Sequence, residues 1–177
     1  MDRRRRFLLQ SWRGNRQILN AIFERQQLDF EYPKNIRFKC ERCALCCGNT
    51  KEKVRHILLL EVEVERIAKK TSKNIGEFAE KIEGAKPYVY LMRKTAEGKC
   101  VFLKDNLCSI YRIRPLICKF YPFQLENAKN GKFKFTYTTE CPNIGKGPKL
   151  KRSFFEKFLK EAVKIMKEDS SDSENKY

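Results

Sequence analysis

Histidine is almost absent from this sequence, which contains only one, His56, in 177 residues. Because His56 lies in an apolar run, we expect a core or surface residue rather than a ligand or a base. The sequence also lacks the G-x-G-x-x-G and P-loop motifs and the C-x-x-x-C-x-x-C motif of radical S-adenosylmethionine enzymes. Ser109, beside Cys108, has no evident base. These absences argue against a self-contained hydrolase.

Long apolar runs are missing too. The short apolar stretch 7–9 follows a basic start but gives way at once to polar residues, so it does not form the apolar region of a secretory signal. Nothing approaches the ~20 apolar residues of a membrane-spanning helix. We therefore expect no transmembrane segment and a cytoplasmic location. In a reducing cytoplasm, cysteines favour metal binding over disulfides.

Acidic residues are scarce relative to basic ones. Lys and Arg number 39 against 22 Asp and Glu, which gives a formal net charge of +17. Such an excess favours an anionic partner, either nucleic acid or an acidic protein. The alternative is that abundant charged residues reflect a thermophilic source. Which redox or substrate protein would pair with the chain stays open.

What the sequence does have is eight cysteines. Four form the cluster C-x-x-C-x-x-C-C and four lie downstream; in order they are Cys40, Cys43, Cys46, Cys47, Cys100, Cys108, Cys118 and Cys141. Thiolates are soft metal ligands, and short spacings let one loop present several of them to one site. Packing as small apolar residues is an alternative, but it explains the dense first cluster poorly. A disulfide-stabilised fold without metal is a further alternative.

The spacing of the first cluster is typical of a loop that wraps an iron–sulfur cluster. A zinc knuckle could use the same residues. We prefer iron–sulfur, of the 4Fe–4S type, with Zn²⁺ as the alternative, because three cysteines recur at two-residue intervals and histidine is missing. Neighbouring side chains tend to point apart, so Cys46 and Cys47 could serve two different sites. Eight thiols suffice for two four-thiolate sites.

Apolar periodicity and turn residues predict a small α+β domain with short strands, a hairpin, flanking helices and cysteine-rich loops stapled by metal. The expected organisation is a basic N-terminal helical extension over 1–30, a cysteine-cluster domain over 31–148, an amphipathic helix over 149–168 and a disordered tail over 169–177. Trp12 and Ile18 carry the first helical pattern.

Inside the central domain we expect helices over 61–70 and 75–82. Strands are expected over 54–60, 88–92 and 100–103. Asn130-Gly131 lies between two alternating apolar runs and predicts a hairpin. Gly145, Gly147 and Pro148 predict a linker.

The downstream half adds motifs to the first cluster. G-x-C-x-F-L begins at Gly98, C-x-I-Y-x-x-R-P-x-x-C-x-x-Y-P-F begins at Cys108, and C-P-x-I begins at Cys141. In this order, and over about residues 36–145, the sequence resembles the cysteine-cluster family known by its CxxCxxCC motif, also called the YkgJ-like family. All eight cysteines fall on family positions. Lys119 stands where the family often has Arg, and Asn143 where it often has Gly.

The resemblance implies a zinc- or iron-chelating domain. One branch of the family includes flagellin lysine methylases that use S-adenosylmethionine, so it also implies redox or protein-modification chemistry supported by the metal centre. The alternative function is a non-enzymatic zinc or iron–sulfur module that binds nucleic acid or an acidic partner through its basic surface. Whether the chain is an enzyme is left open.

Three residues near the downstream cysteines are candidates for cofactor binding: Tyr111, Arg114 and Tyr121. The positive charge of Arg114 would favour thiolates at Cys108 and Cys118. The two tyrosines could hydrogen-bond to sulfur or to a substrate. Alternatives for them are amphipathic core aromatics, and for Arg114 a structural ion pair.

Overall fold

The computed structural model describes residues 30–51, 53–85, 87–127 and 133–174. The chain forms two compact units, which are described separately below. The aromatic unit comprises 1–39, 85–87 and 122–177, and the cysteine unit comprises 40–84 and 88–121. Seven of the eight cysteines belong to the cysteine unit. The helix predicted over 1–30 lies outside the described residues, and the predicted domain boundaries stay predictions.

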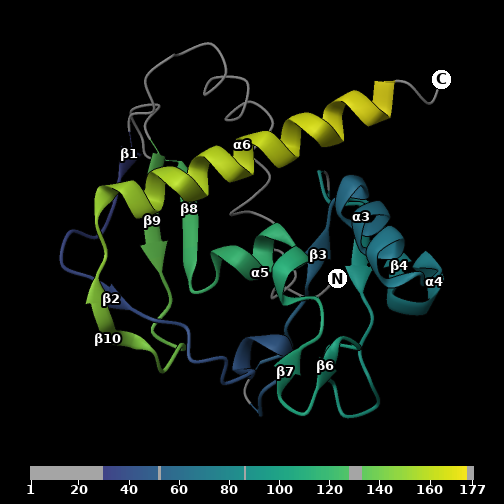
Figure 1. Ribbon diagram of the computed structural model, residues 1–177, viewed down its shortest axis with the longest axis horizontal. Helices are drawn as coiled ribbons and strands as arrows, with labels where there is room; N and C mark the ends of the chain where they lie inside the picture. Colours follow the sequence, from purple (N-terminus) through teal and green to yellow (C-terminus); the bar gives the residue numbers. More distant parts are fainter. Residues whose placement is uncertain (1–29, 52, 86, 128–132, 175–177) are drawn as a thin grey trace. The chain divides into compact units, whose positions relative to one another are not determined.

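A three-stranded sheet forms the base of the aromatic unit, with strand order β1-β9-β8 (Figure 1). Strands β8 (Phe123–Asn127) and β9 (Phe133–Tyr137) pair antiparallel along their whole length, as the predicted hairpin requires. The turn between them lies outside the described residues. β1 (Phe30–Glu31) adds to the other edge of β9 in parallel orientation.

The long helix α6 (Arg152–Glu174) packs on this sheet through aromatic side chains. Phe155 is fully buried, and its ring centroid lies 5.0 Å from that of Phe135 and 5.3 Å from that of Phe123. Leu159 and Ala162 continue the buried stripe at helical spacing. The helix runs past residue 168, its predicted end. Ser and Asp lower helix propensity by only fractions of a kcal/mol, and each added residue closes another hydrogen bond.

A second, two-stranded sheet of the aromatic unit pairs β2 (Arg37–Phe38) with β10 (Ile144–Lys149). The linker predicted over 145–148 is therefore wrong, because these residues form a strand. Gly147 has a φ of 77°, and a Cβ there would lie 2.5 Å from the Cβ of Lys39. The glycine thus allows two backbones to approach closely at a shift of strand register.

The cysteine unit is built around another three-stranded antiparallel sheet, of order β3-β5-β4. Its strands are β3 (Leu58–Leu59), β4 (Ala79–Lys81) and β5 (Tyr90–Met92). Helices α3 (Glu61–Thr71) and α4 (Ile75–Phe78) connect the strands. The helix predicted over 75–82 therefore ends at Phe78. Pairing with β5 buries Phe78 and Ala79 in the core, and this tertiary gain overrides local helix propensity.

The second half of the cysteine unit consists of short elements. A hairpin joins β6 (Leu103–Lys104) to β7 (Leu107–Cys108). Its turn residues, Asp105 and Asn106, have φ angles of 48° and 59°. Both values suit the tight turn that the twist of a two-residue hairpin favours. The predicted strand over 100–103 is mostly turn instead. The one-turn helix η2 (Tyr111–Ile113) and helix α5 (Leu116–Phe120) complete the unit.

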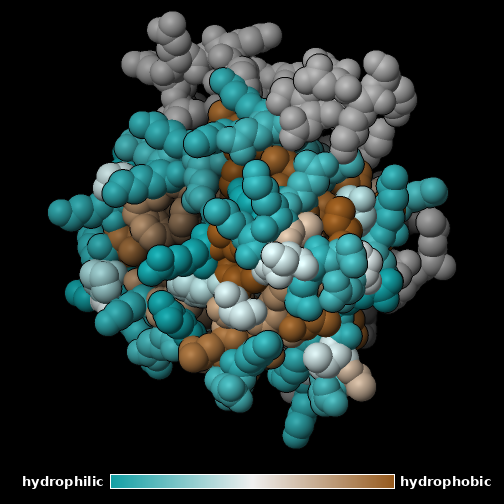
Figure 2. Space-filling model, turned by 45° about the vertical axis from the view of Figure 1, so that its right-hand side comes forward, coloured by the Kyte–Doolittle hydropathy of each residue, from teal (hydrophilic) through white to brown (hydrophobic). Residues whose placement is uncertain are grey.

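Helices and several small sheets occur together, so the predicted α+β class is confirmed. The face drawn in Figure 2 is largely hydrophilic, in keeping with a mean hydropathy of −0.64. Among the described residues, no helix is both long enough and apolar enough to cross a membrane.

Candidate metal centre

Five thiols gather on the core of the cysteine unit. Cys100 is part of the buried core, and Cys47, Cys108 and Cys118 pack against it. Cys46 joins the group because it lies next to Cys47 and interacts electrostatically with Cys100, Cys108 and Cys118. The five come from four places in the fold: the one-turn helix η1 (Leu45–Cys47), the turn at Cys100, β7 and α5. We call them the five-thiol group.

The adjacent cysteines of η1 bring their sulfurs together. Ala44 adopts a left-handed conformation with φ of 60° and leads into the turn, and the Sγ atoms of Cys46 and Cys47 lie 4.0 Å apart. The tendency of neighbouring side chains to point apart does not hold here. Two thiolates on a tetrahedral zinc at 2.3 Å would be separated by about 3.8 Å. The pair therefore has nearly the spacing that one shared metal ion requires.

Burial and the neighbouring thiols make the negatively charged thiolate form of each cysteine less favourable. A hydrogen bond with the Cys47 thiol, together with burial, raises the pKa of Cys46 far above its ordinary value. Burial raises the pKa of Cys100 and of Cys108. Cys118 is half-buried as a residue but its thiol is enclosed by protein, and this burial raises its pKa well above the usual range. Several thiolates at this position require a cation, which a bound metal supplies.

Three basic side chains act against this repulsion. Arg55 lowers the pKa of Cys46, Lys94 that of Cys100, and Arg114 that of Cys108. Burial lowers the pKa of Lys94 itself. The predicted electrostatic role of Arg114 toward Cys108 agrees with this arrangement, whereas the roles of Arg55 and Lys94 were not predicted. All three cations would offset the negative charge of a thiolate-rich centre.

The loop that carries Cys46 and Cys47 is held against the turn before Cys100. The N–H of Cys100 donates to the carbonyl of Cys47 at 2.7 Å, and the N–H of Asn49 donates to the carbonyl of Gly98 at 2.9 Å. A Cβ at Gly48 would lie 2.8 Å from the Gly98 oxygen, so only glycine permits this approach. Two thiol-bearing segments far apart in sequence are thus fixed side by side.

Lys94 and Asn49 lock the same junction through their side chains. The Nζ of Lys94 donates to the Asn49 Oδ1 at 2.6 Å and also to the carbonyl of Arg55. The Asn49 Oδ1 in turn accepts the N–H of Arg55 at 3.1 Å. The Asn49 amide oxygen therefore links the ammonium group of Lys94 to the backbone of Arg55.

Glu63 holds the helix that carries Cys118. Its side chain is fully buried, and one carboxylate oxygen accepts the N–H of Leu116 at 2.6 Å while the other accepts the N–H of Leu60 at 3.1 Å. The first bond ties α3 to the first turn of α5. Burial raises the pKa of Glu63, and the two backbone bonds oppose this shift.

The other three predicted ligands are not members of the five-thiol group. Cys40 and Cys43 are exposed, and Cys141 is buried in the aromatic unit. All eight cysteines are thiols. Within the described ranges, no three His, Cys, Asp or Glu side chains converge closely enough to hold a metal ion as they stand. The donor chemistry suits a soft metal, and the thiols would have to close further around one, as expected where binding and folding are coupled.

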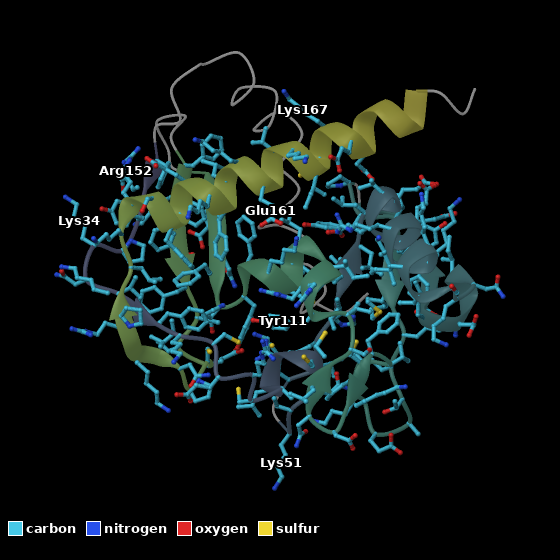
Figure 3. All side chains as sticks on the ribbon, in the orientation of Figure 1. Lys34, Lys51, Tyr111, Arg152, Glu161 and Lys167 are labelled. Atoms are coloured by element: carbon cyan, nitrogen blue, oxygen red, sulfur yellow. The ribbon has the colours of Figure 1, made fainter. Side chains whose placement is uncertain are left out.

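Each predicted cofactor-binding residue takes part in a stack between an arginine and a tyrosine. The guanidinium carbon of Arg114 lies 3.9 Å from the ring centroid of Tyr111, and that of Arg42 lies 4.4 Å from the same centroid. Arg55 covers the ring of Tyr121 at 4.9 Å and donates to its hydroxyl at 3.2 Å. Figure 3 labels Tyr111, with nitrogen atoms beside it. The arginine partners Arg42 and Arg55 were not predicted.

Comparison of the sequence with known families identifies the class of protein as a zinc- or iron-chelating domain. The chain belongs to the CxxCxxCC family, whose model matches residues 39–142 and is described as a "Putative zinc- or iron-chelating domain". The resemblance found from the motifs is thereby confirmed. Metal chelation is the family's described property, and the choice between iron–sulfur and zinc lies beyond that description.

Two curated relatives come from Methanocaldococcus jannaschii. Uncharacterized protein MJ0661 is 27% identical over 123 residues, which cover 66% of this chain and 61% of the relative. Uncharacterized protein MJ0939 is 26% identical over 140 residues, which cover 76% of this chain and 45% of the relative. The chain thus spans less than two thirds of either relative. No solved structure matches it.

Proposed function

We propose that the five-thiol group holds an iron–sulfur cluster through four of its members. The observation that carries the proposal is the gathering of five mutually interacting thiols on one core, next to three cations and without histidine. The carboxylate of Glu63, which acts on Cys118, already accepts a backbone N–H at each oxygen. A donor set made only of thiols is the one that iron–sulfur clusters use.

Zinc in a four-thiolate site is the second candidate for the same group. The 4.0 Å separation of the Cys46 and Cys47 sulfurs favours it, because that distance is close to the edge of a zinc tetrahedron. A zinc site of this kind would be structural, since its coordination would be complete.

An iron–sulfur cluster supplies one-electron transfer when bound. Cys46, Cys47 and Cys108 are only half-buried, so a partner or substrate could approach the centre from their side. Arg55, Lys94 and Arg114 would favour the more negative, reduced state of a cluster and so raise its potential. Redox chemistry, or protein modification that needs an electron, is the function these properties support.

The three remaining predicted ligands belong to the same proposal. Cys40 and Cys43, with the member of the five-thiol group left over, would supply ligands of a second site within the cysteine unit, and Cys141 stays a proposed ligand. The C-x-x-C spacing of Cys40 and Cys43 suits two ligands on one loop. A reducing cytoplasm, the proposed location, would keep these exposed thiols available.

Metal and sulfide analysis of protein purified without oxygen tests the choice of metal. We expect brown protein that contains iron and acid-labile sulfide in equal amounts. Colourless protein that contains zinc alone would reject the cluster and leave the zinc site. Protein without any metal, prepared in the same way, would reject both.

A non-enzymatic binding module is the alternative that the net charge of +17 favours. Its test is binding to single- and double-stranded nucleic acid at several salt concentrations. If the module contacts phosphates through basic residues, affinity should fall steeply with salt and should weaken when residues 1–16 are removed. Affinity that does not depend on salt would reject this alternative.

A further inference from the structure

Two guanidinium groups share one aromatic ring beside the five-thiol group. Arg42 and Arg114 place their guanidinium carbons 4.4 Å and 3.9 Å from the centroid of Tyr111. Both distances are those of direct stacking. Two positive charges therefore lie against one ring.

This stack fixes the two arginines in place. The Nη1 of Arg114 donates to the carbonyl of Tyr111 at 2.7 Å, which ties the side chain to η2. Arg42 has a left-handed backbone conformation with φ of 55°, in the loop between Cys40 and Cys43. Cation–π contact holds a long side chain at little further entropy cost. The donors of both groups are thus preorganised.

The charges of this stack have no carboxylate partner in the part of the chain that the structure describes. Among the described residues, neither Arg42 nor Arg114 forms an ion pair with a carboxylate. The Tyr111 hydroxyl also makes no hydrogen bond within the described part of the chain. Arg42 is exposed and Tyr111 is half-buried, so solvent reaches this place. Within the described residues, most guanidinium N–H groups of the two arginines and the phenol hydroxyl therefore have no protein acceptor.

We propose that Arg42, Tyr111 and Arg114 form a binding site for a phosphate group, and we call it the arginine–tyrosine clamp. A phosphate ester carries up to two negative charges and three acceptor oxygens. It can therefore accept bonds from both guanidiniums at the edge of the ring and from the Tyr111 hydroxyl. A single carboxylate needs only one guanidinium fork. Two positive charges with no internal counter-ion suit the more highly charged group.

The arginine–tyrosine clamp lies close to candidate metal ligands. Arg114 also acts on the thiol of Cys108, and Arg42 lies one residue from Cys43. A phosphorylated ligand would therefore be held next to the proposed metal centre. The clamp stands on arginine and tyrosine contacts alone, so it does not depend on which metal the thiols hold.

Phosphorus-31 NMR titration of the purified full chain with inorganic phosphate tests the clamp directly. Arg42→Gln and Arg114→Gln should each weaken binding about tenfold, because each removes a charge-assisted hydrogen-bonded pair. Arg112→Gln is the matched control: Arg112 is exposed, lies in the same element and stacks on no ring among the described residues. It should bind phosphate as the unsubstituted chain does.

Competition experiments with an oligonucleotide and with a peptide identify the kind of ligand. Single-stranded oligothymidylate that competes with phosphate, and loses affinity with Arg42→Gln, would support a nucleic-acid backbone as the source. Binding of phosphate without such competition would support a small phosphorylated molecule. A glutamate-rich peptide that displaces phosphate completely at equal concentration would overturn the phosphate assignment.

Metal content is measured for every variant, so that damage to the metal centre is distinguished from loss of phosphate binding. Arg42→Gln is the decisive variant because its side chain is exposed and its loss should leave folding intact. Equal phosphate binding by Arg42→Gln and Arg112→Gln, or no phosphate binding by the unsubstituted chain, would overturn the proposal.

Discussion

The carboxylate of Glu63 accepts the backbone N–H of Leu116 at 2.6 Å, although the two residues are 53 positions apart in the sequence. Leu116 begins the helix that carries Cys118, so a buried charge on one helix positions a candidate ligand on another. Buried carboxylates are costly unless they are fully hydrogen-bonded, and here both oxygens are used. Such an arrangement links the stability of the fold to the geometry of the thiols.

Glu63→Ala should strongly destabilise the protein. The substitution leaves the N–H groups of Leu60 and Leu116 without their acceptors in a buried place, at a cost of about 1–3 kcal/mol each. Glu63→Gln retains an amide oxygen and should lose less. Urea unfolding measures both effects. Glu80→Gln, on the exposed part of β4, serves as the control and should change little. Equal stability of Glu63→Ala and the control would contradict the role assigned to Glu63.

Gly48→Ala should loosen the loop that carries Cys46 and Cys47. The added Cβ would lie 2.7 Å from the Cδ of Lys99 and 2.8 Å from the Gly98 oxygen, so the backbone must shift. We expect a loss of about 1–3 kcal/mol of unfolding free energy, together with weaker metal retention. Gly76→Ala provides a matched control, because a Cβ there meets nothing within 4 Å. Thermal unfolding and metal analysis of the two variants should therefore differ clearly.

Stability of the metal-free protein should fall as the pH rises above about 8.5, the ordinary thiol pKa. The raised thiol pKa values of Cys46, Cys100, Cys108 and Cys118 mean that the folded state keeps protons that the unfolded state has lost. Their stabilising contribution is complete below that pH and disappears toward the higher folded pKa values. The lowered pKa of Lys94 makes stability rise with pH, but this single group is outweighed by the four thiols.

Urea unfolding of metal-free protein at pH 7 and pH 10 measures this effect. Metal-loaded protein is the comparison, since its ligands are already deprotonated and should not show the same decline. A metal-free protein that is equally stable at both pH values would contradict the burial of these thiols.

Single cysteine substitutions should separate the two proposed sites. Cys118→Ser removes a ligand of the five-thiol group and should lower both metal content and stability. Cys43→Ser changes an exposed residue and should remove only the metal of the second site, with less effect on unfolding. Metal analysis and thermal unfolding of both variants give the comparison. Identical losses in the two variants would indicate one site rather than two.

Local signals in the sequence predicted the elements that local chemistry determines. Asn130-Gly131 predicted the pairing of β8 with β9. The cysteine motifs predicted the family. Gly147 contributed to the wrong prediction of a linker. Glycine also occurs where a second strand approaches closely, and that approach cannot be inferred from one segment.

Contacts between distant segments could not be predicted in this way. Lys94 and Asn49 meet across 45 positions, and no pattern in either segment points to the other. Glu63 alternates with Val62 and Val64 among other glutamates, so the sequence does not single it out, and its partner Leu116 offers only a backbone N–H. The arginine partners of Tyr111 and Tyr121 also depend on the fold.

X-ray absorption spectroscopy at the edge of the bound metal tests the central claim most directly, because it reports the atoms that surround the metal whichever metal it is. We predict a first shell made only of sulfur at about 2.3 Å, with about four sulfurs per metal. Cys100→Ser together with Cys118→Ser should remove this signal in proportion to the metal lost from the five-thiol group. A first shell dominated by nitrogen or oxygen in the unsubstituted protein would contradict a thiolate centre.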